Sequence, residues 1–276
     1  MSDSFNKDEA NIARSHAALD LRGLTAARVA LERTGVSVTT RHALEFSLAH
    51  AQARDAVHSS LAVSSLMAAL RERDLVAIAV RSAVSNRIEY LRRPDLGRTL
   101  AASSAEVLAA RDPESGRKAT VVSVILADGL SALAVERHAL PLLDALLPMI
   151  RPNAAEAATE AAASWALAPV VVAEQARVAL GDEIGVALEA NVTVMLIGER
   201  PGLSSPASLG AYITGAPRPG RTDAERNCVS NIHTEGLSYA DAARKIAWFV
   251  SEGRKLGRTG IELRDSSATG PRALTD

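Results

Sequence analysis

Residues 119–126 read ATVVSVIL and residues 191–197 read NVTVMLI, and both runs are apolar and rich in β-branched side chains. A shorter run of three valines covers residues 170–172. Between and after these runs lie helical patterns at 131–150, 155–166 and 179–190. Continuous apolar strands that alternate with helices are typical of a parallel sheet covered on both faces. We therefore predict an α/β fold with a Rossmann-like, open, mostly parallel sheet.

Upstream of this sheet the chain is predicted to be largely helical. Apolar residues from Leu21 onward indicate a helix that stops at Gly35, and further helices are expected from Thr39 or Thr40 to His58 and over 61–70. The run LVAIAV at 75–80 predicts the first strand.

Two more elements are expected between this strand and residue 119. Ile88 to Leu91 forms a short apolar segment that we interpret as a strand. A helix is predicted to start with Asp95 as its N-cap and to bury Leu100 and Val107.

The last strong element is a helix after Ser238. Ser238 and Asp241 have the spacing of a capping box, and Gly257 provides a stop. We divide the chain into a flexible lead-in at 1–19, a helical region at 20–72, an α/β domain at 73–265 and a flexible tail at 266–276.

Composition narrows the class of function. The chain has 276 residues, a formal net charge of -1, 3% aromatic residues and one cysteine, and alanine makes up about a fifth of it. A nearly neutral chain has no electrostatic footprint for nucleic acid. One cysteine excludes internal disulfides, and no apolar run is long enough to span a membrane. We expect no nucleic-acid partner and no membrane partner.

Two polar loops follow predicted strands and are candidate ligand contacts, because open parallel sheets bind ligands at the carboxyl ends of their strands. Asp128 could hold a carboxylate over a ligand or serve as a turn residue. Glu199, in the sequence GERPG, could accept hydrogen bonds from a ligand or pair internally with Arg200. Nucleotide-binding glycine motifs of the GxGxxG and GxxxxGK[ST] types are absent from the sequence.

Cys228 and the histidines do not form a catalytic or metal-binding pattern. Cys228 has no neighbouring His or Asn arrangement that would lower its pKa, so we interpret it as a small packed residue near a ligand. His233 lies in NIHTEG, which differs from the cobalt-ligating DxHxxG motif by Asn231 in place of Asp. These patterns predict no metal ligand.

Several segments together resemble the small (light, β) subunit of ethanolamine ammonia-lyase. The strongest are VMLIGERPGL at 194–203 and PRPGRTDAERNCVSNI at 217–232. Weaker matches are LTAARVALERTG at 24–35, HAQARDAVH at 50–58, YLRRPDLGR at 90–98 and ILADGLS at 125–131. The resemblance covers residues from about 20 to about 265.

The resemblance implies an adenosylcobalamin-dependent lyase that converts ethanolamine to acetaldehyde and ammonia by a radical mechanism. It implies a large catalytic subunit as partner, six copies of each subunit, and a corrinoid bound base-on between them. Three corrinoid contacts are implied for this chain: Val178, Glu199 and Cys228. Because the large subunit holds the substrate and the radical-handling side chains, the resemblance implies no catalytic residue in this chain.

The resemblance also bears on location. Some members have a longer N-terminal extension that is associated with a bacterial microcompartment, whereas only 19 polar residues precede the match here. The expected location is therefore a bacterial microcompartment or the cytoplasm. The alternative function is a stand-alone α/β module that binds a small molecule or regulates another protein.

Overall fold

The computed structural model of the chain describes residues 27–29, 31–110, 120–150 and 165–266. The chain divides into two compact units, Met1–Ala51 and Gln52–Asp276. The predicted flexible segments at 1–19 and 266–276 lie outside the described residues, apart from Ser266. The predicted domain boundaries therefore stay predictions.

The first unit contains a hairpin where a helix was expected. Strand β1 (Arg33–Thr34) pairs antiparallel with β2 (Ser37–Val38). Gly35 lies in the two-residue loop between them with φ of 64°, a conformation that glycine adopts without steric cost. The predicted helix over residues 21–34 is therefore wrong for its described part, and Gly35 makes a turn instead of ending a helix.

The predicted second and third helices are confirmed. Helix α2 (Thr40–His58) begins at the expected threonine, and α3 (Val63–Arg71) covers the third helical pattern. Helix α3 turns Leu66 and Leu70 into the core of the second unit.

The second unit is built on a seven-stranded sheet. Its strands are β3 (Ala77–Arg81), β4 (Thr120–Ala127), β5 (Trp165–Leu167), β6 (Val170–Glu174), β7 (Val192–Gly198), β8 (Leu209–Gly215) and β9 (Arg226–Ile232). Their order is β3-β6-β4-β7-β8-β9, with β5 paired to β4. Strands β3, β6, β4 and β7 run parallel, while β8 and β9 add antiparallel at one edge. The α/β class and the mostly parallel sheet are confirmed; the Rossmann-like description stays a prediction.

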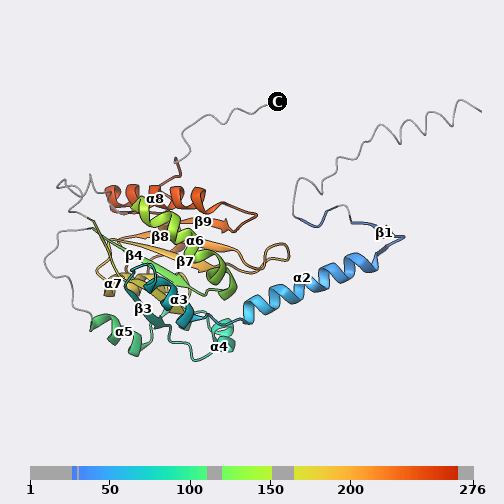
Figure 1. The fold of residues 1–276 in the computed structure, drawn as a ribbon, viewed down its shortest axis with the longest axis horizontal. Coiled ribbons are helices and arrows are strands. Elements are labelled where there is room, and N and C mark those ends of the chain that lie inside the picture. Colours follow the sequence, from blue (N-terminus) through green and yellow to red (C-terminus); the bar gives the residue numbers. More distant parts are fainter. Residues whose placement is uncertain (1–26, 30, 111–119, 151–164, 267–276) are drawn as a thin grey trace, which may run out of the picture. The chain divides into compact units, whose positions relative to one another are not determined.

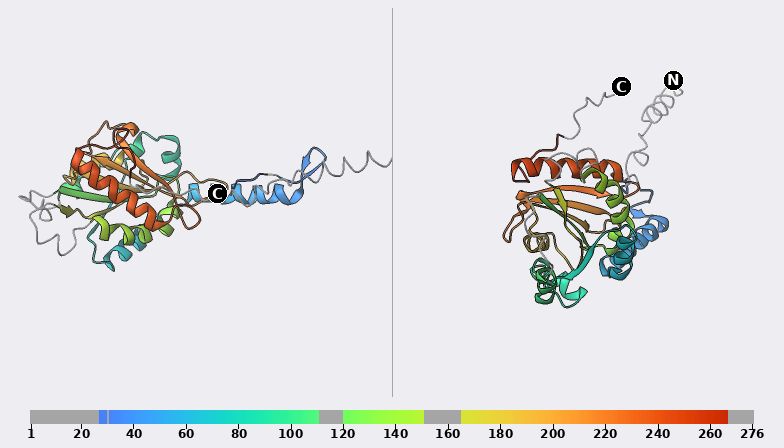
Figure 2. Two further views of the ribbon diagram at one scale, coloured as in Figure 1. Left: turned by 90° about the horizontal axis from the view of Figure 1, so that it is seen from above. Right: turned by 60° about the vertical axis from the view of Figure 1, so that its left-hand side comes forward.

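Helices cover both faces of this sheet (Figures 1 and 2). Helices α3, α6 (Ala132–Ile150) and α8 (Tyr239–Leu256) pack on one face, and α5 (Ala102–Ala109) and α7 (Leu180–Ala187) pack on the other. The central strands alternate between the faces: on β7, Val194 and Leu196 point to the first core, and Met195 and Ile197 to the second. Both faces of β7 are buried, which explains its uninterrupted apolar sequence.

The capped C-terminal helix is confirmed. The Ser238 side chain accepts a hydrogen bond from the Asp241 amide at 3.2 Å, and Gly257 ends α8 in the left-handed conformation. Ala242, Ile246, Phe249 and Val250 are buried along the predicted stripe. Within the described residues, no helix combines the length and the apolar character that crossing a bilayer requires.

The predicted strand at Ile88–Leu91 is wrong, because this segment forms helix α4 (Arg87–Arg92). Asn86 caps the helix by accepting a hydrogen bond from the Glu89 amide at 3.0 Å. The short apolar run of this segment does not distinguish a strand from one buried helical turn. Tyr90 supplies that buried face.

The helix predicted from Asp95 begins later. Asp95 precedes the short 3-10 helix η2 (Leu96–Arg98), but its carboxylate pairs with Arg93 and makes no side-chain capping hydrogen bond. Helix α5 then starts at Ala102 and buries Leu108, while Val107 is 52% exposed.

The antiparallel strands β8 and β9 were not predicted, and neither was β5. A helix was expected at 155–166. Residues 155–164 of that range lie outside the described residues, and the other two, Trp165 and Ala166, belong to β5.

Candidate functional site

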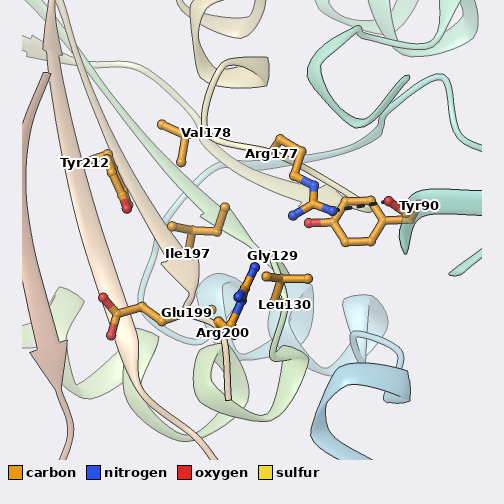
Figure 3. Close-up of a pocket in the computed structure, with 10 residues that line it drawn as sticks. Tyr90, Gly129, Leu130, Arg177, Val178, Ile197, Glu199, Arg200 and Tyr212 are labelled. Carbon is orange, nitrogen blue, oxygen red and sulfur yellow. Dashed lines mark hydrogen bonds between the residues drawn. The ribbon is translucent and has the colours of Figure 1, made fainter. Parts of the chain in front are cut away.

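A cavity of about 470 Å³ lies beyond the carboxyl ends of the parallel strands. Three loops surround it, which follow β4, β6 and β7 in the chain. Because these strands are parallel, their carboxyl ends meet at one edge of the sheet. The lining residues are Tyr90, Gly129, Leu130, Arg177, Val178, Ile197, Gly198, Glu199, Arg200 and Tyr212 (Figure 3).

Two glycines let the loops after β4 and β7 pack backbone against backbone. The Leu130 amide donates to the Gly198 carbonyl oxygen at 2.9 Å. Gly129 has φ of 53°, and a Cβ at this position would lie 2.2 Å from that same oxygen. A Cβ on Gly198 would lie 2.1 Å from the Ser131 carbonyl oxygen. Neither position has room for a side chain, so these glycines fix the floor of the cavity.

Asp128 holds the loop after β6 rather than a ligand. Its carboxylate accepts hydrogen bonds from the amides of Gln175 and Ala176 at 2.9 and 3.0 Å and pairs with Arg87 at 3.2 Å. Burial raises the pKa of Asp128 to about 6, while Arg87 and the two amides oppose the rise. Of the two roles considered from sequence, the structural one is the one observed.

Tyr90 forms one end of the cavity and lies between two arginines. The guanidinium carbons of Arg87 and Arg177 are 4.7 and 4.2 Å from its ring centre. Its hydroxyl donates to the Ala176 carbonyl oxygen at 2.9 Å. Burial raises the pKa of Tyr90, so the phenol is neutral. Sequence reasoning did not single out these residues, because they come from separate segments that only the fold brings together.

Glu199 follows β7 directly and is anchored through one carboxylate oxygen. Oε2 accepts hydrogen bonds from the Ser208 hydroxyl at 2.5 Å and from the Asn231 amide at 3.2 Å. Among the described residues no donor contacts Oε1, and no ion pair joins Glu199 to Arg200. The internal Glu–Arg pair is therefore not formed, and Glu199 lines the cavity with one acceptor oxygen available.

The structure brings Val178 and Glu199 to the same cavity, and Cys228 lies beside it. Val178 is in the turn before α7 and lines the cavity. Cys228 is on β9, directly opposite Tyr212 of β8, and Tyr212 lines the cavity. Cys228 is exposed, and desolvation and then the charge of Glu199 raise the pKa of its thiol, against a hydrogen bond with Tyr212 that lowers it. A neutral thiol is a poor nucleophile.

The loop after β9 uses both nitrogens of His233 internally. Nε2 hydrogen-bonds with the Asn231 side-chain oxygen at 2.9 Å, and the Glu235 amide donates to Nδ1 at 3.3 Å. Across the described part of the chain, no three His, Cys, Asp or Glu side chains are grouped as metal ligands.

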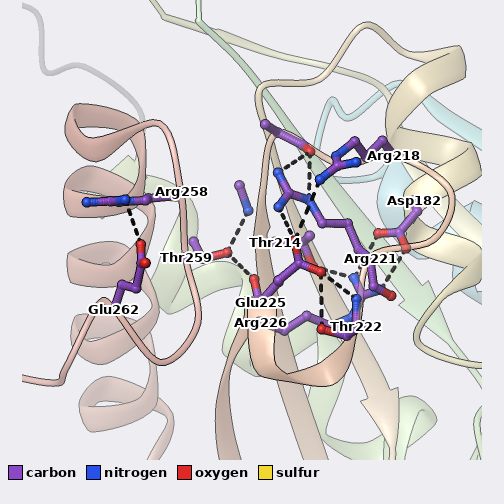
Figure 4. Close-up of polar contacts among 12 residues, drawn as sticks. Asp182, Thr214, Arg218, Arg221, Thr222, Glu225, Arg226, Arg258, Thr259 and Glu262 are labelled. Atoms are coloured by element: carbon purple, nitrogen blue, oxygen red, sulfur yellow. Dashed lines mark hydrogen bonds and ion pairs between the residues drawn. The ribbon is translucent and has the colours of Figure 1, made fainter.

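The sequence RTDAERN at 221–227, which directly precedes Cys228 in the chain, forms a network of polar contacts (Figure 4). Arg226 pairs with Asp182 of α7 through two bonds of 2.6 and 2.7 Å, and both side chains are 2% exposed. Thr222 and Glu225 form a capping box, and Arg221 pairs with Glu225 at 2.5 Å. This network fixes the start of β9 against α7, and so it sets where Cys228 lies.

These features define an α/β protein with a cavity at the carboxyl edge of its parallel strands. The lining residues offer apolar surface from Leu130, Val178 and Ile197, one free carboxylate oxygen and two arginines. The lining contains neither a histidine nor a cysteine, so no nucleophile and base meet there. The cavity is suited to binding and orienting a ligand.

Comparison with known proteins gives the family. The sequence model of the ethanolamine ammonia-lyase light chain matches residues 15–264. The ethanolamine ammonia-lyase small subunit of Bradyrhizobium diazoefficiens is 54% identical over 250 residues, covering 91% of both chains. Those of Azotobacter vinelandii and Pseudomonas fluorescens are 51% and 48% identical, each covering 90% of this chain and 87% of the relative. The chain belongs to the ethanolamine ammonia-lyase small-subunit family and is part of a lyase.

Proposed function

We propose that this chain is the small subunit of an adenosylcobalamin-dependent ethanolamine ammonia-lyase, which converts ethanolamine to acetaldehyde and ammonia by a radical mechanism. In this proposal a large subunit carries the catalytic centre, and Val178, Glu199 and Cys228 contact the corrinoid at the interface between the subunits. When bound, the corrinoid supplies the radical by homolysis of its cobalt–carbon bond. This chain binds the cofactor and excludes water from it.

The observation that carries the proposal is the half-anchored carboxylate of Glu199. A corrinoid is a broad apolar disc fringed with amide side chains, whose N–H groups need acceptors. Ser208 and Asn231 fix Oε2, and Oε1 is left to accept from such an amide. Val178 and Ile197 supply apolar contact nearby. The residues of the cavity therefore fit one edge of a corrinoid.

The size of the cavity favours a shared site. A volume of about 470 Å³ accommodates a drug-sized ligand, and a corrinoid with its nucleotide loop is larger. The remainder of the cofactor must lie outside this chain, where a large subunit would cover it. The stand-alone binding module, by contrast, would need a ligand that this cavity encloses by itself.

Reconstitution tests the proposal. The purified chain, the large subunit and adenosylcobalamin together are expected to release acetaldehyde from ethanolamine, and omission of any one of them is expected to abolish release. If either subunit alone released acetaldehyde as fast as the mixture, the division of roles would be wrong. Assembly measured by light scattering is expected to give six copies of each subunit.

A further inference from the structure

Two arginines line the cavity, and neither is paired with a carboxylate in the described part of the chain. Arg177 and Arg200 both line the cavity, and Figure 3 shows Arg177 on the opposite side from Glu199. Among the ion pairs of the described residues, none includes Arg177 or Arg200. Asp128, the nearby buried carboxylate, is already bound by Arg87 and two backbone amides.

Arg177 is held in place by contacts that leave its charge available. Its amide donates to the Gly97 carbonyl oxygen at 2.8 Å, and its Nη2 donates to the Tyr90 carbonyl oxygen at 3.3 Å. The guanidinium stacks 4.2 Å from the centre of the Tyr90 ring. A Cβ on Gly97 would lie 2.9 Å from its Cγ, so only glycine allows this close approach. The side chain is therefore ordered before any ligand binds.

The guanidinium has unused hydrogen-bonding capacity. Its Nε is buried and has no acceptor among the described residues. Figure 3 shows one terminal nitrogen turned to Tyr90 and the other facing the cavity. A stacked guanidinium with free N–H groups is well suited to an oxyanion, above all a phosphate, which it can bind with two parallel hydrogen bonds.

We infer that Arg177 binds the phosphodiester of the cofactor's nucleotide loop. This inference rests on the proposed function, because it assigns the anion of the same ligand to the opposite side of the same cavity. Cobalamin carries one phosphodiester, and its amide fringe is neutral. Glu199 and Arg177 thus recognise two different parts of the cofactor, an amide donor and a phosphate anion.

The test compares cyanocobalamin with dicyanocobinamide, a corrinoid that lacks the nucleotide loop and its phosphodiester. Affinities are measured by isothermal titration calorimetry on the assembled complex with the large subunit. Arg177→Gln is expected to weaken cyanocobalamin binding at least about tenfold and to leave dicyanocobinamide binding unchanged. Arg177→Lys keeps the charge, so its affinity for cyanocobalamin is expected to lie between the affinities of the wild type and of Arg177→Gln. Arg137→Gln, which removes an exposed arginine from α6, is the matched control.

Unchanged dicyanocobinamide binding also shows that the variant is folded and assembled. Equal losses for both corrinoids, or no loss for either, would overturn the phosphodiester assignment while leaving the proposed function intact. If the wild-type complex bound neither corrinoid, the proposed function itself would fail.

A third arm separates the cofactor's phosphodiester from free phosphate. Inorganic phosphate is added to the wild-type complex and to the Arg177→Gln complex, with sodium chloride at equal ionic strength as reference. If inorganic phosphate competes with cyanocobalamin in the wild-type complex but not in the Arg177→Gln complex, the inference is supported. Phosphate binding that depends on Arg177, without any difference between the two corrinoids, would assign the arginine to free phosphate instead.

Discussion

At the level of a single residue, Glu199 anchors its loop through Oε2 and is proposed to accept a hydrogen bond from the cofactor through Oε1. Two substitutions separate the observed role from the proposed one. Glu199→Gln keeps the shape of the side chain but removes its charge, and it is expected to weaken cobalamin binding by about 1–3 kcal/mol. Ser208→Ala removes the 2.5 Å anchor and leaves the carboxylate in place, so a smaller loss is expected. Calorimetric titration of the complex with cyanocobalamin measures both. A larger loss for Ser208→Ala would mean that anchoring the loop, rather than accepting from the ligand, is the main role of Glu199.

Cys228 is expected to react as an ordinary or slow thiol. Desolvation and the charge of Glu199 raise the pKa of its thiol, so little thiolate is present at pH 7.5. Iodoacetamide labelling, followed by mass spectrometry, is expected to be slower than for free cysteine at pH 7.5 and to accelerate above pH 9. Cys228→Ser is expected to retain partial activity. Fast labelling at neutral pH, together with complete loss of activity in the serine variant, would indicate a chemical role.

Residues that act through short motifs could be predicted from the sequence, and those that act through the fold could not. Glu199 was placed at the ligand edge because it directly follows an apolar strand. Tyr90 and Arg177 are 87 positions apart and meet only because α4 and the loop after β6 converge on Asp128. The sequence around Tyr90 and the sequence around Arg177 contain no signal that predicts this contact.

At the level of elements, the buried Asp128 makes stability depend on pH in an uncommon direction. Its folded-state pKa of about 6 lies above the ordinary value of 3.8 for an aspartate. The unfolded chain therefore loses this proton first, and the stabilisation present below about pH 4 is lost as pH rises to about 6. Relative to Asp128→Asn, the unfolding free energy of the wild type is expected to fall by about 2–3 kcal/mol over that range.

Urea unfolding of both proteins at several pH values measures this difference. The difference is expected to be flat above about pH 7, where Asp128 is ionised in both states. A difference that instead grew with pH would show that Arg87 and the two amides stabilise the carboxylate more than burial destabilises it.

Close packing of the loops after β4 and β7 is expected to tolerate no added methyl group. Gly198→Ala places a Cβ 2.1 Å from a backbone oxygen, and backbone cannot move away as a flexible side chain can. A loss of more than about 3 kcal/mol in unfolding free energy is expected. Gly202→Ala, in the same GERPG segment, has its nearest contact at 3.6 Å and is the control. Similar thermal melts for the two variants would contradict this account of the cavity floor.

The helices and strands that could be predicted are those whose surroundings are encoded in their own local sequence. Strands β4 and β7 are buried on both faces and read as continuous apolar runs, and α8 carries its own cap and stop signals. Strand β9 buries every third residue, Arg226, Val229 and Ile232, and so lacks the two-residue alternation typical of a strand. The strand includes Arg226 and Asn227, which are paired with side chains or backbone elsewhere. Its polarity is explained only by partners distant in sequence, so the pattern gave no strand signal.

At the scale of the whole molecule, the proposal divides the cofactor contacts between this chain and the large subunit. High cofactor affinity is therefore expected only in the complex. In the proposed complex the cavity of this chain contacts one edge of the cofactor, and Glu199 and Arg177, which line that cavity, are the proposed polar contacts. The isolated chain is therefore expected to bind cyanocobalamin at least about a hundredfold more weakly than the complex, a difference of about 2.7 kcal/mol. Thermal melts of the isolated chain are expected to shift little with cyanocobalamin, since stabilisation follows the ratio of ligand concentration to Kd. Equal affinities for the isolated chain and the complex would mean that this chain encloses the ligand alone, as a stand-alone binding module would.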